Sequence, residues 1–94
     1  MYNITKEQYE EVKNQLLEEI EEKNYWSGQI NDQFEDGVDY QLNLTVIIYR
    51  SKEDGTITDL VPIWWEFHTW ENEDSDVEIA NDFLFSELHK HMNF

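Results

Sequence analysis

The chain has 94 residues, with 22 aspartates and glutamates against 6 lysines and arginines, giving a formal net charge of −16. This balance excludes binding to nucleic acid or to an anionic membrane by charge attraction, because phosphate contacts require lysine and arginine. The absence of cysteine excludes disulfides, thiolate metal ligands and thiol nucleophiles.

Length and composition predict a single folded domain spanning residues 1–94. Aromatic residues make up 15% of the chain, whereas acidic disordered chains contain few of them. Repulsion among so many like charges opposes the compact state, so the acidity is either tolerated or retained because a basic partner binds it. No basic segment followed by an apolar stretch opens the chain, and no apolar run approaches the about 18 residues of a membrane span. We therefore expect a cytoplasmic protein.

Residues 5–23 have the pattern of an amphipathic helix. Thr5 and Gln8 have the spacing of a capping box, and Ile4 and Tyr9 that of a hydrophobic staple. Apolar residues at helical spacing predict one buried stripe: Tyr9, Val12, Leu16, Leu17 and Ile20. The second half, where the helix dipole disfavours negative charge, carries a group of glutamates: Glu18, Glu19, Glu21 and Glu22.

Two strands are expected next. Trp26, Gly28 and Ile30 alternate within residues 24–34 and indicate a first strand, followed by a turn at residues 35–37. From Val38 the alternation is strict, with one apolar face: Val38, Tyr40, Leu42, Leu44, Val46 and Ile48. At the end of this second strand, Ile47 and Tyr49 make the other face apolar as well.

A third strand is expected from about Thr56 to Trp70, after a hairpin loop at residues 51–55. Alternation assigns one face to Ile57, Val61, Ile63, Trp65 and Phe67. The same rule assigns the opposite face to Leu60, Trp64, Glu66, His68 and Trp70. Pro62 cannot donate a ladder hydrogen bond, so it requires an edge position or a bulge.

An acidic loop at residues 71–76 leads into the C-terminal part. The rest, to Phe94, is expected to be a helix with Asp76 or Asp82 as its N-cap, because Phe85, Leu88 and Met92 form a helical stripe. The alternative is a short strand at residues 77–80 before a shorter helix. The order of elements predicts an α+β two-layer sandwich, in which helices cover an antiparallel three-stranded meander, with or without a short fourth strand.

Metal and catalytic sites find little support in the sequence. Calcium-loop candidates beginning at Asp32 and Asp74 each lack a required ligand or glycine. His89 and His91 point apart on a helix and are better interpreted as cations near its C-terminus. Glu66, between two aromatic residues, is the one candidate for a catalytic carboxyl, and an exposed strand position is the favoured interpretation. We expect no metal, no cofactor and no enzymatic activity.

The Trp64-Trp65 pair predicts an aromatic surface, because adjacent strand residues point to opposite faces. If Trp65 packs under the helices, Trp64 lies on the other face with Leu60 and Trp70, beside Glu66 and His68. Such a face is unusually apolar for a solvated surface. A second helix, a second copy of the chain or a binding partner would each explain it.

The acidic residues carry the functional hypothesis. Carboxylates at helical spacing stand about 5–6 Å apart, and duplex DNA presents one phosphate charge per about 1.7 Å, so rows of carboxylates can imitate a nucleic-acid strand. We expect a non-enzymatic decoy or inhibitor of a basic, nucleic-acid-handling protein, comparable to phage anti-defence proteins or nuclease immunity proteins. The expected contact residues are Glu18, Glu19, Glu21, Glu22, Glu71, Glu73, Asp74 and Asp76, with Trp64 and Trp70 as apolar anchors.

The alternative hypothesis is a self-associating structural or interaction protein. It would use the sheet face that carries Trp64 and Trp70, and its acidity would serve solubility only. A decoy would be a monomer or small homodimer that loses its partner as salt rises, whereas dimers formed through aromatic residues would be indifferent to salt.

Overall fold

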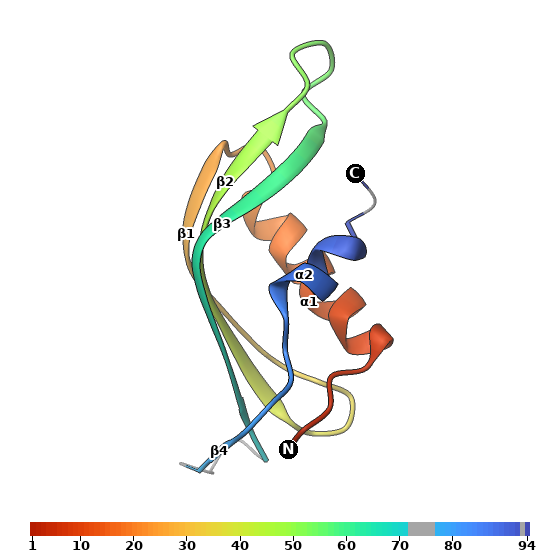
Figure 1. Ribbon diagram of the computed structural model, residues 1–94, viewed down its shortest axis with the longest axis vertical. Helices are drawn as coiled ribbons and strands as arrows, with labels where there is room; N and C mark the ends of the chain where they lie inside the picture. The colour runs from red at the N-terminus through yellow and green to blue at the C-terminus, as the bar shows by residue number, and fades with distance from the viewer. Residues whose placement is uncertain (72–76, 93) are drawn as a thin grey trace.

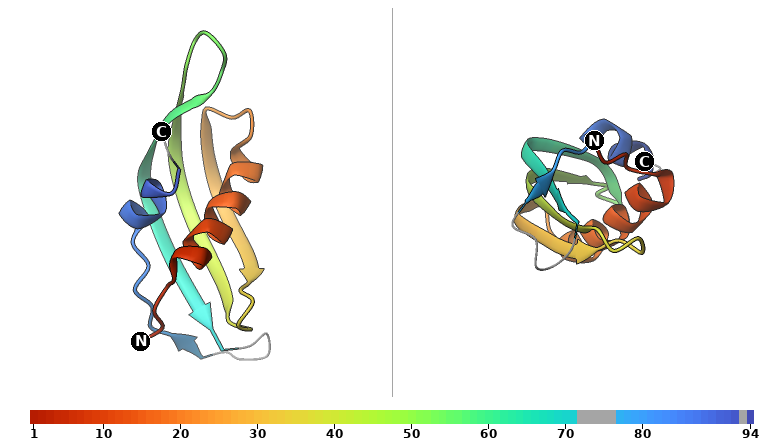
Figure 2. Two further views of the ribbon diagram at one scale, coloured as in Figure 1. Left: turned by 90° about the vertical axis from the view of Figure 1, so that its right-hand side faces the viewer. Right: turned by 90° about the horizontal axis from the view of Figure 1, so that it is seen from below.

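The computed structural model describes residues 1–71, 77–92 and 94 (Figure 1). Helix α1 (Lys6–Ile20) precedes three long strands, β1 (Tyr25–Gln33), β2 (Asp39–Arg50) and β3 (Ile57–Trp70), and two short elements, β4 (Glu78–Ile79) and α2 (Phe85–Lys90). In the described residues the strands form an antiparallel sheet in the order β1-β2-β3-β4. Both of these helices lie on the same face of the sheet (Figures 1 and 2). The predicted α+β two-layer order is confirmed.

The start of α1 follows the predicted capping box. Gln8 N donates to Thr5 Oγ1 at 3.2 Å, and Thr5 N donates to Gln8 Oε1 at 2.9 Å. The stripe of Tyr9, Val12, Leu16 and Ile20 is buried against the sheet, and Leu17 packs at its margin. The helix ends at Ile20, three residues before the predicted end at Lys23.

A bulge in β3 changes the predicted faces of that strand. Its register against β2 shifts between Pro62 and Trp64 and leaves Ile63 as an extra residue. Pro62 therefore lies at a bulge, one of the two settings that its missing N–H allows. The extra residue reverses the alternation, so Leu60 is buried in the core whereas Val61 and Ile63 are exposed. The predicted faces of Leu60, Val61 and Ile63 are wrong for this reason.

The C-terminal part follows the alternative prediction, a short strand and a short helix. β4 pairs with the last two residues of β3, so the backbone at residues 78–79 is extended rather than helical. Asp82, one predicted N-cap, instead accepts a hydrogen bond from Ile4 N at 2.6 Å, and Leu84 takes the N-cap position of α2. The other predicted N-cap, Asp76, lies outside the described residues.

Aromatic rings occupy the centre of the core between the sheet and the helices. The rings of Phe34, Tyr40, Phe67 and Phe83 follow one another with centroid separations of 4.4, 5.6 and 4.1 Å. Tyr9 of α1 joins the row 5.4 Å from Phe83. This aromatic row connects α1, β2, β3 and the segment before α2. Its burial supplies the apolar area that offsets the charge repulsion expected from the composition.

Tyrosine hydroxyls in this core give a matched pair of stability predictions. Tyr40 Oη is buried with no hydrogen-bond partner among the described residues, and burial raises the pKa of Tyr40. Tyr40→Phe is expected to raise the free energy of unfolding by about 1 kcal/mol, because an unsatisfied buried hydroxyl costs about 1–3 kcal/mol. Tyr9→Phe is expected to lower it by about 1 kcal/mol, since Tyr9 Oη accepts a hydrogen bond from Leu84 N at 3.1 Å. Urea denaturation measures both values, and a destabilised Tyr40→Phe variant would contradict the first.

Candidate functional site

The C-terminal end of α1 is held by Arg50, the only arginine in the chain. Arg50 Nη2 donates to Ile20 O at 2.9 Å and also to Glu21 O, and Nε donates to Lys23 O at 3.0 Å. Nη1 reaches Gly55 O in the β2–β3 loop at 3.0 Å. The guanidinium therefore satisfies the last carbonyls of α1 and compensates the negative end of the helix dipole. Tertiary structure thus supplies the positive charge that the helix sequence itself lacks.

The glutamates predicted to bind a partner surround this end of α1 and are all exposed. Together with Lys23 they line an open depression of about 440 Å³: Glu18, Glu19, Glu21 and Glu22. Lys23 Nζ donates to the backbone oxygen of Glu19 at 2.9 Å rather than to a carboxylate. Across the described ranges, none of the four carboxylates forms a salt bridge. Their charge is unneutralised because the two nearest cations bind backbone carbonyls.

A second acidic group lies where α1 faces the β1–β2 turn: Glu11, Asp32, Glu35 and Asp36. Burial, together with the carboxylates of Glu35 and Asp32, raises the pKa of Glu11. The groups that contact these carboxylates are neutral, since Asp32 accepts from Gln15 Nε2 at 2.9 Å and Asp36 from the Tyr2 hydroxyl. The sequence alone does not predict this group, because Glu11 is distant in sequence from the turn. The position of Glu11 on α1, one residue before the buried Val12, is the signal that could have placed it near the sheet.

The remaining acidic residues of the predicted site lie elsewhere. Glu71 is exposed directly after β3, at the end of the sheet opposite the C-terminal end of α1 (Figure 1). Glu73, Asp74 and Asp76 lie outside the described residues. The structure therefore does not bring Glu71 together with the glutamates of α1.

The sheet face turned away from the helices carries no other described element over it (Figures 1 and 2), and we call it the open face. At the end near the α1 C-terminus, Tyr25, Ile47 and Val61 form one cross-strand row. Trp64 and Tyr49 belong to the neighbouring rows. Together with the partly buried Ile47, the exposed side chains form an apolar patch: Tyr25, Ile47, Tyr49, Val61 and Trp64. The exposed fractions of Tyr25, Tyr49, Val61 and Trp64 range from 40% to 57%. Trp64 thus lies on the open face as predicted, and the other residues of the apolar patch come from β1, β2 and β3.

Beside the apolar patch, side-chain amides of β1 and β2 form a closed ring of hydrogen bonds. Gln29 donates to Asn43 at 2.9 Å, and Asn43 donates to Gln41 at 3.2 Å. Gln41 donates to Asn31 at 2.9 Å, and Asn31 donates to Gln29 at 3.0 Å. Each amide of this ring keeps a second N–H and a second lone pair for other partners. A hydroxyl pair separated by 2.7 Å lies between the amide ring and the apolar patch: Ser27 and Thr45.

His68 connects two carboxylates on the charged part of the open face. Its Nδ1 lies 2.7 Å from Glu78 Oε1, and its Nε2 lies 3.1 Å from Glu66 Oε2. Hydrogen bonds to Glu78 and then Glu66 raise the pKa of His68. The imidazole also stacks on Trp70, the second predicted anchor, with centroids 6.0 Å apart. Glu66, the catalytic candidate, has a side chain that is 51% exposed and is not enclosed by apolar walls.

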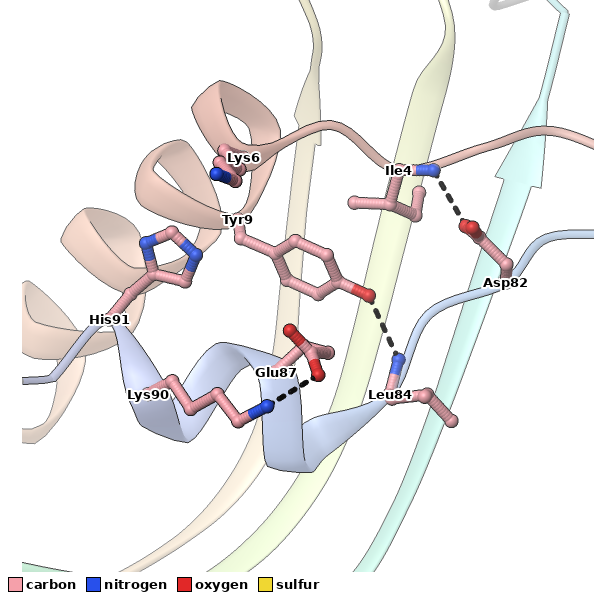
Figure 3. Close-up of a pocket in the computed structure, with 8 residues that line it drawn as sticks. All are labelled: Ile4, Lys6, Tyr9, Asp82, Leu84, Glu87, Lys90 and His91. Carbon is pink, nitrogen blue, oxygen red and sulfur yellow. Dashed lines mark hydrogen bonds and ion pairs between the residues drawn. The ribbon is translucent and has the colours of Figure 1, made fainter.

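A groove of about 560 Å³ separates the N-terminal end of α1 from α2 (Figure 3). Its polar groups bind one another: Tyr9 Oη accepts from Leu84 N, Ile4 N donates to Asp82, and Lys90 Nζ lies 2.9 Å from Glu87 Oε1. The first two contacts connect the segment before α2 to α1 and to the N-terminal segment, and the third lies within α2. The groove is therefore interpreted as a structural contact between these elements.

Comparison with protein-family models, with curated proteins and with solved structures finds no match for this chain. The function is therefore argued from its surfaces. Among the described residues, neither helix combines the length and the apolar character needed to span a membrane.

Proposed function

We propose that this chain is a non-enzymatic, cytoplasmic decoy that binds a basic, nucleic-acid-handling protein such as a nuclease. The observation that supports the proposal is the state of Glu18, Glu19, Glu21 and Glu22. They are exposed and form no salt bridge in the described part of the chain, although Arg50 and Lys23 lie beside them. Carboxylates at this end of a helix oppose its dipole. A role in binding explains why such an arrangement is retained.

The mechanism is occlusion of a phosphate-binding groove. Lysines and arginines that hold nucleic-acid phosphates would pair with Glu18 and Glu19 in the last turn of α1 and with Glu21 and Glu22, which directly follow it. The field of a chain with net charge −16 would accelerate the encounter and make it sensitive to salt. The second acidic group, which contains Glu11 and Asp32, extends the same field toward the other end of α1.

The quadruple variant Glu18→Gln/Glu19→Gln/Glu21→Gln/Glu22→Gln is expected to bind the partner about thirty-fold more weakly, since exposed charge pairs contribute about 0.2–1 kcal/mol each. Its free energy of unfolding is expected to rise by about 1 kcal/mol, because charges that oppose the helix dipole are removed. The partner is captured from nuclease-treated lysate on the immobilised chain, with duplex DNA as competitor. The dissociation constant of the partner is then measured for the parent chain and for the quadruple variant.

The control for this experiment is Glu7→Gln/Glu53→Gln, which removes charge from the first turn of α1 and from the β2–β3 loop. This variant is expected to bind within about two-fold of the parent chain, since neither residue belongs to the proposed contact. Equal binding by the parent and the quadruple variant at all salt concentrations would refute the decoy proposal. That result would favour the alternative, in which acidity serves solubility and the open face alone is functional.

A further inference from the structure

On the open face, β1 and β2 present a long uncharged stretch, although the chain has a net charge of −16. From the row of Tyr25 and Ile47 to the amide ring, every residue that β1 and β2 present on this face is uncharged. These residues are Tyr25, Ser27, Gln29, Asn31, Gln41, Asn43, Thr45 and Ile47. Carboxylates lie at the margins of this area, and those of Glu66 and Glu78 are hydrogen-bonded to His68. Two copies of so acidic a chain repel each other wherever carboxylates meet. The open face is where they can approach without that repulsion.

The same face is complementary to itself, which a two-fold symmetric interface requires. An apolar patch can pack against its own copy, and tyrosine and tryptophan are the residues that most often dominate interface energetics. Amides can likewise pair with amides, because each one both donates and accepts. Two hydrogen bonds already fix every amide of the ring, so little side-chain freedom would be lost on association.

From these observations we infer that a second copy of this chain covers the open face. The two sheets pack face to face about 10 Å apart, with apolar patch against apolar patch and the two Trp64 side chains near the symmetry axis. A basic partner is a poorer match for this surface, because β1 and β2 offer amides and hydroxyls there. The nearest carboxylate, that of Glu66 on β3 beside Asn43, is hydrogen-bonded to His68. The inference does not depend on the decoy proposal.

The dimer would have a direct consequence for the acidic surface. Because α1 lies on the opposite side of the sheet (Figure 1), the glutamates at its C-terminal end remain exposed on both outer faces. One dimer would therefore present two separate acidic surfaces. Salt would screen the repulsion between two protomers of net charge −16. The dimer is therefore expected to tighten as salt rises, rather than be indifferent to salt as aromatic contacts alone would make it, whereas decoy binding weakens.

Sedimentation velocity over a range of protein concentrations, at low salt and at about 1 M salt, tests the inference directly. We expect a concentration-dependent dimer whose dissociation constant falls with salt. Trp64→Glu is expected to raise this constant at least a hundred-fold by placing a carboxylate near the symmetry axis. The matched control Leu84→Glu replaces another half-exposed apolar residue, on the helix side of the sheet, and is expected to leave the dimer intact. Circular dichroism verifies that both variants are folded.

Nuclear magnetic resonance identifies the surface. Side-chain amide signals of Gln29, Asn31, Gln41 and Asn43 are expected to shift with concentration, and mixed labelled and unlabelled protein is expected to give contacts between protomers at Trp64. A monomer under all conditions would overturn the inference, as would a dimer that survives Trp64→Glu. A dimer that dissociates as salt rises would also overturn it. The quadruple glutamine variant is expected to dimerise normally, so failure of the decoy proposal and failure of this inference are distinguishable.

Discussion

Replacing Arg50 by methionine is expected to lower the free energy of unfolding by about 3 kcal/mol. The guanidinium donates to four backbone oxygens, two at the end of α1, one at Lys23 in the connection to β1 and one in the β2–β3 loop. Hydrogen bonds to charged groups contribute about 1.5–3 kcal/mol each. Most of these carbonyls can form hydrogen bonds with water instead, so the expected loss is well below the sum of the four contributions. Methionine keeps the apolar stem, so the change reports the lost contacts rather than a cavity. For a domain stable by roughly 5–15 kcal/mol, this loss is a large fraction.

Two controls separate the contacts of Arg50 from its charge. Lys52→Met makes the same change in net charge in the neighbouring loop and is expected to alter stability by less than about 0.5 kcal/mol. Arg50→Lys keeps the charge but loses the planar fork, so it should lose about half as much as Arg50→Met. Urea denaturation followed by circular dichroism measures all three. Equal effects of Arg50→Met and Lys52→Met would show that Arg50 does not cap α1.

The parts of the fold that could be predicted from the sequence are those determined locally. The spacing of Thr5 and Gln8 is sufficient to identify the start of α1, because the capping box joins residues within one turn. Strict alternation from Val38 to Ile48 identifies β2 and its core face, because one buried face allows one pattern. The short turn between β1 and β2 implies antiparallel pairing, which the structure confirms.

The faces around the bulge could not be predicted, because they depend on contacts distant in sequence. Pro62 indicated an irregularity, but the position of the extra residue is set by register against β2. β4 and α2 are short, so tertiary contacts rather than local propensity fix them. One such contact is the hydrogen bond from Asn81 Nδ2 to Phe67 O at 3.0 Å.

In the candidate site, too, locally determined features could be predicted and features that depend on long-range contacts could not. Exposure of the glutamates at the end of α1 could be predicted from helical periodicity, but the grouping of acidic residues could not, because it depends on how α1 packs on the sheet. The amide ring could have been predicted from the sequence. A tight turn centred on Asp36 pairs Asn31 with Gln41 and Gln29 with Asn43, as the register shows. Alternation by itself identifies these positions only as the polar side of the strands.

Replacing Phe83 by alanine is expected to have the largest effect on stability, a loss of about 4 kcal/mol, since Phe→Ala changes in cores cost about 3–5 kcal/mol. Phe83 lies outside every helix and strand, yet it is only 4% exposed. Its ring stacks on Phe67 at 4.1 Å with an interplanar angle of 8°, and Trp65 lies 5.5 Å away. Phe83 therefore holds α2 and the segment before it against β3 through packing alone.

Phe83→Leu keeps the variant measurable if Phe83→Ala does not fold. A loss of about 1.5 kcal/mol is expected, from a smaller cavity and the missing ring contacts. The control Phe94→Ala removes a phenylalanine that is 47% exposed, and should change stability by less than about 0.5 kcal/mol.

Chemical denaturation at low and high salt gives a further check. Salt screens the repulsion among the carboxylates, so it should stabilise the parent chain and Phe83→Leu by the same amount, because ring packing and surface repulsion are separate contributions. An effect of Phe83→Leu no larger than that of Phe94→Ala would mean that the aromatic row is not what holds this acidic chain together.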